Sequence, residues 1–203
     1  MLLRSTGNGN WTLEPSGTQM TLQGMWGSSP GDLYAVGVGG TILHSTGNGQ
    51  WTAQMSGTTQ ALAAVWGSSA MDVYVVGASG AILHSTGDGK WSPQTSGVAV
   101  WLNGIAGRTP CDLWIAGAGG TVLRSTGDGR WTAAPRNTFY TLTAVVAGPR
   151  DVWIAGYGGT VLHSAGGPFT AEPPATSEIL LGIAVAGTSV FATGTASTIV
   201  RGR

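Results

Sequence analysis

The sequence predicts an all-β protein, a five-bladed β-propeller with four antiparallel strands in each blade. The first observation is composition: 42% of the 203 residues are hydrophobic, 9% are charged and 35 residues are glycine. Such a chain favours many short strands joined by tight turns over helices. The second observation is a repeat of roughly 40 residues along the whole chain, which is the period of a propeller blade. Residues 1–203 are therefore expected to form a single domain.

Three motifs recur with this period. A strand followed by a turn appears as LLRSTGNGNW at 2–11, ILHSTGNGQW at 42–51, ILHSTGDGKW at 82–91 and VLRSTGDGRW at 122–131, and it decays to VLHSAGGPF at 161–169. Another strand appears as GDLYAVG, MDVYVVG, CDLWIAG, RDVWIAG and SVFATG. An apolar stretch precedes each of these strands and begins at Leu22, Leu62, Leu102, Leu142 and Leu180. With the segment after each turn, the motifs indicate four short strands per unit and no helix.

Two aromatic columns follow the same period and predict what packs between the blades. The column on the second strand consists of Tyr34, Tyr74, Trp114, Trp153 and Phe191. The column on the outermost strand consists of Trp11, Trp51, Trp91, Trp131 and Phe169. A lone blade has two apolar faces that nothing covers, so stacking the blades around an axis buries both faces and the aromatic rings.

The place of the chain ends within the repeat predicts how the ring closes. Residues 1–17 contain only the outer part of a blade, and residues 180–203 supply inner strands. We expect one composite blade from both ends, with residues 11–15 as its outermost strand. Residues 2–5 and 198–201 are copies of one strand and compete for one place. We expect the N-terminal copy to hold it, because that copy is continuous with its hairpin, and we expect a monomer.

The hairpins also carry a resemblance to known repeats. STGDGKW and STGDGRW resemble the Asp-box of bacterial neuraminidase (BNR) repeats, and GGTVLRSTGDGRW is similar to repeats of photosystem II assembly-factor-like propellers. The resemblance covers nearly the whole chain and implies a propeller fold and a bacterial protein. It is irregular, because Asp88 and Asp128 lie three residues after the serine, one more than usual. Asn8 and Asn48 replace the aspartate in two copies, and Gly167 removes it from the fifth.

Both columns of acidic or amide side chains are expected to shape turns. In the hairpins, the side-chain oxygen of Asn8, Asn48, Asp88 or Asp128 can accept backbone N–H groups of the turn. Exchange between Asp and Asn indicates that geometry matters there, and one acid per loop is too few for calcium. The second column precedes the second strand and consists of Asp32, Asp72, Asp112 and Asp151. We expect these to cap Asx-type turns; the alternative is a cation or acid/base site.

No metal, cofactor or catalytic residue is predicted. The histidines His44, His84 and His163 share one strand position with arginines of other repeats, so we expect a solvated or interblade polar position and no zinc cluster. Cys111 is the single cysteine, and we interpret it as a small apolar residue beside a turn.

Charge and hydropathy exclude several classes of partner. Nine basic and nine acidic residues cancel, so the chain lacks the basic footprint of a nucleic-acid or anionic-membrane binder. No apolar run is long enough to span a membrane. No signal peptide precedes the repeats, and an extracytoplasmic location is favoured only if the chain was cut from a longer precursor.

Variation among the repeats predicts which face binds. The hairpins that carry Asp are nearly identical and lie at one end of each blade, whereas the segments that enter the innermost strands differ. The candidate ligand-binding residues in those segments are Met20, Gln60, Trp101, Phe139, Tyr140 and Glu178. Variable loops on a rigid scaffold are where binding residues gather. We therefore predict a non-enzymatic binding scaffold for a protein or peptide.

Three other interpretations stay open. The first is a lectin with several similar sites, because aromatic rings stack on sugars. The second is drift in loops that bind nothing. The third is a glycosidase, which needs two carboxyl groups on one face, and there Glu178 has no evident partner. A sialidase also needs an arginine cluster and a tyrosine nucleophile, which the repeats do not offer, so the Asp-box resemblance carries fold and not activity.

Overall fold

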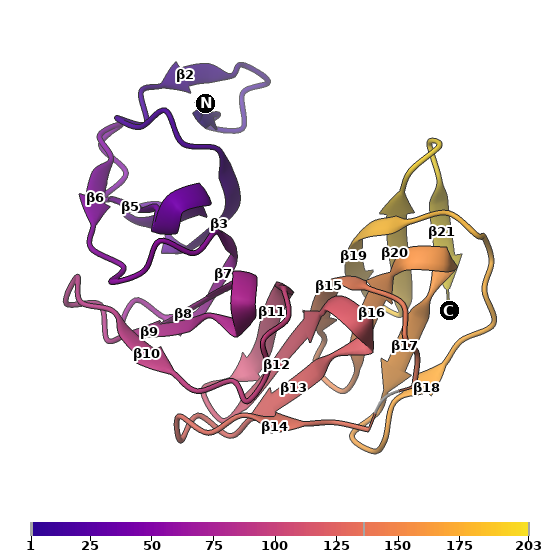
Figure 1. Cartoon of the computed structure of the whole chain (residues 1–203). Helices are drawn as coiled ribbons and strands as arrows, with labels where there is room; N and C mark the ends of the chain where they lie inside the picture. The colour runs from indigo at the N-terminus through magenta and orange to yellow at the C-terminus, as the bar shows by residue number, and fades with distance from the viewer. Residues whose placement is uncertain (1, 136, 203) are drawn as a thin grey trace.

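The strands form a row of antiparallel sheets that follow one another along an open arc (Figure 1). The computed structural model describes residues 2–135 and 137–202. Within these residues four sheets have four strands each, the C-terminal sheet has three and the N-terminal sheet has two. The predicted all-β fold with four antiparallel strands per repeat is confirmed. The predicted number of five blades is not, since six sheets are present in the part of the chain that is described.

Each complete sheet consists of four consecutive strands. The first contains β3 (Leu22–Ser29), β4 (Asp32–Gly37), β5 (Ile42–Ser45) and β6 (Thr52–Gln54). The second contains β7 (Leu62–Ser69), β8 (Asp72–Gly77), β9 (Ile82–Ser85) and β10 (Ser92–Gln94). The third contains β11 (Leu102–Thr109), β12 (Asp112–Gly117), β13 (Val122–Ser125) and β14 (Thr132–Ala133). The fourth contains β15 (Leu142–Ala147), β16 (Val152–Gly156), β17 (Val161–Ser164) and β18 (Thr170–Ala171).

The two end sheets are incomplete versions of the same unit. The N-terminal sheet holds β1 (Leu2–Arg4) and β2 (Thr12–Glu14), which correspond to a third and a fourth strand. The C-terminal sheet holds β19 (Leu180–Ala186), β20 (Ser189–Gly194) and β21 (Ile199–Gly202), which correspond to a first, second and third strand. Short 3₁₀ turns join the second and third strands of the complete sheets: η1 (Val38–Gly40), η2 (Ala78–Gly80), η3 (Ala118–Gly120) and η4 (Tyr157–Gly159).

Aromatic side chains from the two predicted columns meet between neighbouring sheets. The Tyr34 ring on β4 packs edge-on against Trp91, just before β10, with 6.0 Å between centroids. The next interface repeats this arrangement with Tyr74 and Trp131 at 6.2 Å. The one after it pairs Trp114 with Phe169 at 5.3 Å. Edge-to-face geometry is favoured for buried rings, so each outermost strand of one sheet is anchored on the second strand of the sheet before it.

Close backbone approach fixes the angle between sheets nearer the axis. Trp26 on β3 lies against Gly67 on β7, and Trp66 lies against Gly107 on β11 in the same way. A Cβ atom added at Gly67 or Gly107 would overlap the indole ring of the facing tryptophan. The sequence columns did not include these two tryptophans, because the third and fourth repeats carry small or branched residues in their place.

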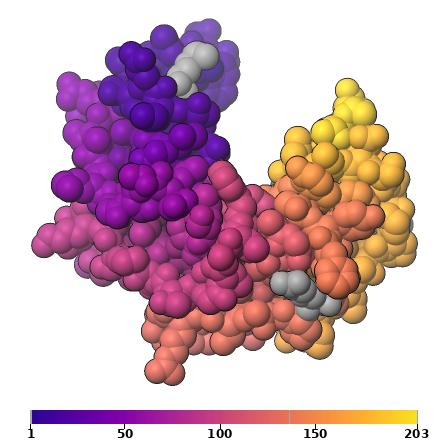
Figure 2. All heavy atoms as spheres, in the orientation of Figure 1, coloured from indigo at the N-terminus to yellow at the C-terminus, as the bar shows by residue number. Residues whose placement is uncertain are grey.

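The predicted composite blade is not formed. Among the described residues, β1 pairs with β2 and β21 pairs with β20, so each copy of the duplicated strand stays in its own sheet. Figures 1 and 2 show the N-terminal and C-terminal sheets at opposite ends of the arc with a gap between them. The expectation that the N-terminal copy takes the third-strand place beside β20 is therefore wrong for this structure.

Local contacts explain where the N-terminal copy lies. Leu2 is buried in a cluster with Ala35 and Leu43 of the adjacent sheet. Arg4 donates from Nη1 to the carbonyl oxygen of Gly47 at 2.7 Å. These contacts hold the two-stranded sheet on the sheet β3–β6, away from β20.

Candidate ligand-binding face

The variable face is built from turns η1 to η4 and the segments that enter the innermost strands. The first residue of each turn donates its backbone N–H to the residue just before the innermost strand: Ala118 to the carbonyl of Trp101 at 2.8 Å, and Tyr157 to that of Thr141 at 2.9 Å. Turns also bridge to the next sheet, since Gly80 N–H donates to the Val100 carbonyl at 2.7 Å. A hydrogen-bonded backbone rim therefore supports the side chains of this face.

Four exposed aromatic residues gather on the third and fourth sheets. Trp101 is 41% exposed, Phe139 84%, Tyr140 58% and Tyr157 43%. The Tyr140 ring lies over Gly158, where an added Cβ would come within 3.2 Å of it. We call these four residues the aromatic patch. Tyr157 was not among the residues that the sequence predicted for the site. The signal was its aromatic side chain at the start of a turn, where η1, η2 and η3 begin with Val38, Ala78 and Ala118.

A shallow hollow of about 390 Å³ continues the patch toward the inner strands. Trp101 and Tyr157 line it together with Gln23, Ala63, Asn103, Thr141, Thr143 and Leu181. Asn103 donates from Nδ2 to the Leu142 carbonyl at 2.7 Å, and Thr143 donates its hydroxyl to the Leu180 carbonyl at 2.5 Å. These polar groups tie neighbouring innermost strands together, so the floor of the hollow is held in place.

The other three candidate residues have their side chains over the turn of their own sheet, and the backbone carbonyl of Glu178 also accepts the N–H of Gly159 in η4 at 2.7 Å. The Gln60 side-chain oxygen accepts the Ser79 hydroxyl at 3.2 Å. Glu178 accepts the hydroxyl of Thr195 at 2.7 Å. Met20 lies beside Gly39. The structure thus places Trp101, Phe139 and Tyr140 in the segments that enter the third and fourth sheets, and Met20, Gln60 and Glu178 in the segments that enter three other sheets.

The opposite end of the sheets carries the Asp- and Asn-bearing hairpins. In each of four hairpins a side-chain Oδ1 accepts the backbone N–H two residues on: Asn8 at 3.0 Å, Asn48 at 3.0 Å, Asp88 at 3.1 Å and Asp128 at 3.1 Å. An amide and a carboxylate make the same bond, so charge is not needed there.

The second acidic column has a role different from the expected turn cap. Asp32 accepts His44 Nε2 at 2.8 Å and Asp72 accepts His84 Nε2 at 2.9 Å, in each case from the third strand of the same sheet. Asp112 pairs with Arg124 at 3.3 Å in the same way, and Asp151 approaches His163 at 3.4 Å. The backbone turn is capped instead by the hydroxyls of Ser29, Ser69 and Thr109. The aspartates therefore join strands within a sheet.

The basic residues of these pairs stack on the second-strand aromatic. His84 stacks on Tyr74 with 4.3 Å between centroids, and His163 stacks on Trp153 at 3.9 Å. The histidines thus contact neighbouring strands within one sheet. The predicted position between blades is wrong. Burial raises the pKa of the Tyr74 hydroxyl, and the nearby Asp72 carboxylate raises it further. Burial and Asp32 raise the pKa of Tyr34 in the same direction.

The remaining chemistry-bearing groups do not cluster. Among residues 2–135 and 137–202, no three histidine, cysteine or acidic side chains come together as a metal site would require. Cys111 is exposed and its N–H donates to the Thr109 hydroxyl. In the same residues, no helix has the length and apolar character to cross a membrane.

Comparison with known proteins shows the fold. No protein-family model and no curated protein matches the chain. The solved structure of YCF48 from Cyanidioschyzon merolae is similar, with a TM-score of 0.75, 18% identity, and coverage of 93% of this chain and 69% of that chain. YCF48 bound to D1 peptide gives a TM-score of 0.73, 16% identity, and coverage of 92% and 66%. YCF48 has a β-propeller fold.

The fold is that of a β-propeller. At these identities the likeness extends to the fold alone. The chain spans about two thirds of the length of the two YCF48 structures.

Proposed function

We propose that this protein is a non-enzymatic scaffold that binds a peptide segment of a partner protein on the aromatic patch. The observation that carries the proposal is the clustering of Trp101, Phe139, Tyr140 and Tyr157 on two adjacent sheets. Large exposed aromatics gathered on a rigid surface are typical of protein-interaction hot spots. The hollow beside them adds a groove with polar and apolar lining.

The chemistry of the patch favours a neutral, apolar segment as its ligand. None of the four patch residues carries a charge, so attraction depends on apolar contact and on hydrogen bonds. The phenol groups of Tyr140 and Tyr157 can donate to backbone carbonyls of an extended peptide. One similar structure is of YCF48 bound to D1 peptide, which supports peptide binding by a propeller of this type.

The distribution of aromatics distinguishes a peptide site from the lectin alternative. A lectin with several similar sites would repeat the same aromatic in each sheet. Here the position of Tyr140 is taken by Met20, Gln60 and Val100 in the preceding repeats. The patch is therefore a single surface over two sheets, which suits one extended segment.

The test is selection from a phage-displayed library of random linear peptides. We expect wild-type protein to enrich neutral peptides with aromatic or branched apolar residues. The Phe139→Ala/Tyr140→Ala variant should bind them at least tenfold more weakly, because two hot-spot rings contribute about 1 kcal/mol or more each. Met71→Ala, an exposed residue at the opposite end, is the matched control. Binding by the double variant as tight as that by wild-type protein would show that the peptides do not bind on this face.

A further inference from the structure

Each innermost strand carries a β-bulge at the same place. The ladder between the first and second strands of a sheet skips one residue, directly after the leucine that begins the innermost strand. A bulged residue is left out of the pairing, and the bulge can re-aim its side chain. We call the five skipped residues the bulge residues: Gln23 on β3, Ala63 on β7, Asn103 on β11, Thr143 on β15 and Leu181 on β19.

All five bulge residues line the hollow beside the aromatic patch. A second hollow of about 350 Å³, further along the innermost strands, is lined by the same five residues. The two hollows therefore meet at the bulge residues. Trp101 and Tyr157 line the first hollow and not the second, which places the aromatic patch at one end. Each hollow has the size of a small-ligand pocket, for which about 300–1,000 Å³ is typical.

The bulge position differs in every repeat, whereas its neighbours hardly differ. Leucine precedes it in all five sheets, and glycine or alanine follows it. A small residue is needed after the bulge, because a Cβ atom added at Gly24 would come within 2.8 Å of the Ala63 carbonyl oxygen on the next sheet. The bulge residue itself is a different amino acid in each sheet. The sheets thus present an asymmetric set of side chains to one hollow, which suits a single ligand group.

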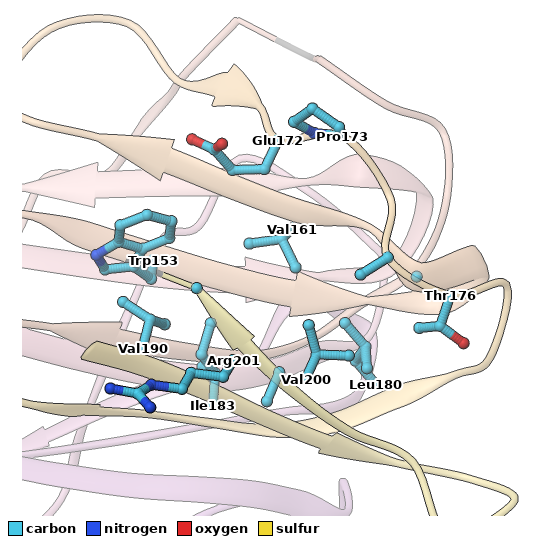
Figure 3. Close-up of a pocket in the computed structure, with 14 residues that line it drawn as sticks. Trp153, Val161, Glu172, Pro173, Thr176, Leu180, Ile183, Val190, Val200 and Arg201 are labelled. Carbon is cyan, nitrogen blue, oxygen red and sulfur yellow. The ribbon is translucent and has the colours of Figure 1, made fainter.

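The hollow differs in charge from the pocket between the fourth sheet and the C-terminal sheet. That pocket, of about 170 Å³, is lined by Trp153 and Val161 from one sheet and by Leu180 from the other (Figure 3). The charged side chains of Glu172 and Arg201 also line it. Within the described part of the chain, no acidic or basic side chain lines the hollow beside the patch. A charged ligand group would lose its hydration there without gaining a charged partner, so the hollow favours a neutral group.

Two polar side chains of the hollow are available to a ligand. Asn103 donates from Nδ2 to the Leu142 carbonyl at 2.7 Å, which leaves its Oδ1 oxygen as an acceptor. The Gln23 side chain is exposed. Among residues 2–135 and 137–202, neither the Gln23 amide nor Asn103 Oδ1 forms a hydrogen bond. Gln23 offers both a donor and an acceptor, and the bulge residues Ala63 and Leu181 add apolar surface.

We propose that one carboxamide side chain of the bound peptide, a glutamine or an asparagine, enters this hollow and is recognised by Gln23 and Asn103. The inference rests on the proposed function, because the peptide is the one that lies on the aromatic patch. A carboxamide carries a donor and an acceptor, so its N–H can donate to Asn103 Oδ1 while its oxygen accepts from Gln23. An apolar side chain in the same place would cover these groups without bonding them, which weakens binding.

The surface beyond the hollow favours a peptide over a neutral sugar, which also carries donors and acceptors. Phe139 and Tyr140 belong to the aromatic patch but do not line the hollow. Phe139 is 84% exposed. A single sugar ring in the hollow would leave both aromatic rings uncovered. A peptide that places one side chain in the hollow and continues over the patch covers them.

The test begins with the peptides that the wild-type protein selects from a random linear library. We expect the selected sequences to share one glutamine or asparagine. Replacing that residue by leucine or glutamate in a synthetic peptide should weaken binding to the wild type about tenfold by calorimetry, because buried polar groups lose their partners. In the protein variant Gln23→Leu/Asn103→Thr, the leucine replacement should cost less than about threefold, because those polar groups are gone.

Both substitutions in this variant should leave the fold intact. Leucine and threonine already occupy the bulge position as Leu181 and Thr143, and Thr143 still donates to the carbonyl of the next innermost strand. Gln50→Leu makes the same chemical change at an exposed position in a hairpin of the opposite end. It is the matched control and should keep the whole preference for the carboxamide. The melting temperature of each variant reports whether it is folded.

Three results would overturn the inference. The first is a set of selected peptides that share no carboxamide. The second is a leucine penalty as large in Gln23→Leu/Asn103→Thr as in the wild type, which would place the carboxamide elsewhere. The third is calorimetric binding of a neutral hexose by the wild type that this variant loses, which would assign the hollow to a sugar. The first two results leave the proposed function standing, whereas failure to select any peptide would overturn the proposed function and this inference together.

Discussion

The indole N–H of Trp91 donates to Oε1 of Gln54 at 2.8 Å across the interface between two neighbouring sheets. Trp91 precedes the last strand of its sheet, and Gln54 ends the last strand of the sheet before it. The outer edges of successive sheets are thus joined by a directional bond, whereas close packing joins the inner strands. This combination holds the arc in one shape and presents the variable turns on a fixed rim.

The first prediction concerns this bond. Gln54→Ala should lower the free energy of unfolding by about 1–3 kcal/mol, because it leaves the buried indole N–H without an acceptor. The double variant Gln54→Ala/Trp91→Phe should lose little more than Trp91→Phe alone, since a phenyl ring needs no acceptor, as the natural Ala134 and Phe169 pair shows. Urea unfolding of the three variants measures this, and strictly additive losses would contradict it.

The second prediction compares two glycines with nearly the same backbone conformation. Gly80 has a φ of 72° and Gly97 a φ of 74°. A Cβ atom added at Gly80 would overlap the Val98 carbonyl oxygen. A Cβ atom added at Gly97 would have no other atom within 4 Å. Gly97→Ala should therefore cost only about 1 kcal/mol for the left-handed backbone. Gly80→Ala should lower the melting temperature clearly more than Gly97→Ala does. Equal losses of stability in the two variants would show that the turn at Gly80 rearranges to admit the methyl group at no cost.

The third prediction separates geometry from charge in the hairpins. Asp88→Asn keeps the oxygen that accepts the Lys90 N–H, so stability should stay within about 0.5 kcal/mol of wild type. Asp88→Ala removes that acceptor and should cost about 0.5–1 kcal/mol. Thermal melts with and without added calcium provide the measurement. A calcium-dependent stabilisation that Asp88→Asn abolishes would assign the hairpin a metal instead.

The fourth prediction concerns alkaline pH. The pKa values of Tyr34 and Tyr74 are raised in the folded protein above the ordinary value of 10.0, first by burial and then by Asp32 and Asp72 respectively. The unfolded chain therefore releases these protons at lower pH than the folded chain does. The contribution of these two hydroxyl groups to the free energy of unfolding is complete below pH 10 and is lost as the pH rises beyond it. Urea midpoints across this range should fall less steeply for the Tyr34→Phe/Tyr74→Phe variant, and parallel curves would contradict the assignment.

Sequence reasoning reached the repeated unit because its cause is local. The strands and their turns follow from alternating apolar runs and glycine pairs that the sequence displays directly. Relations between repeats were harder to predict. Asp72 was assigned to a turn, because spacing alone does not show that His84 faces it across two strands. Tyr157 was passed over, because its neighbourhood with Trp101 exists only once the third and fourth sheets are placed side by side.

The predicted composite blade, which would have closed the ring of sheets, was the largest error, and the reason is geometric. Counting repeats gives the number of strands but not the angle between successive sheets. That angle depends on contacts such as Trp66 against Gly107. The two incomplete sheets therefore remain at the ends of the arc, where pattern matching had joined them.

We propose that the aromatic patch and the turns around it bind a peptide segment. Hydrogen exchange with and without a peptide selected from the library tests it most directly, because the Ala118 and Tyr157 backbone amides lie within this rim. Binding should slow exchange in turns η3 and η4 and in the segments that enter β11 and β15. The Asp88 and Asp128 hairpins at the opposite end should exchange as before. Slowed exchange confined to those hairpins, or to the end sheets, would show that the peptide binds elsewhere on the protein.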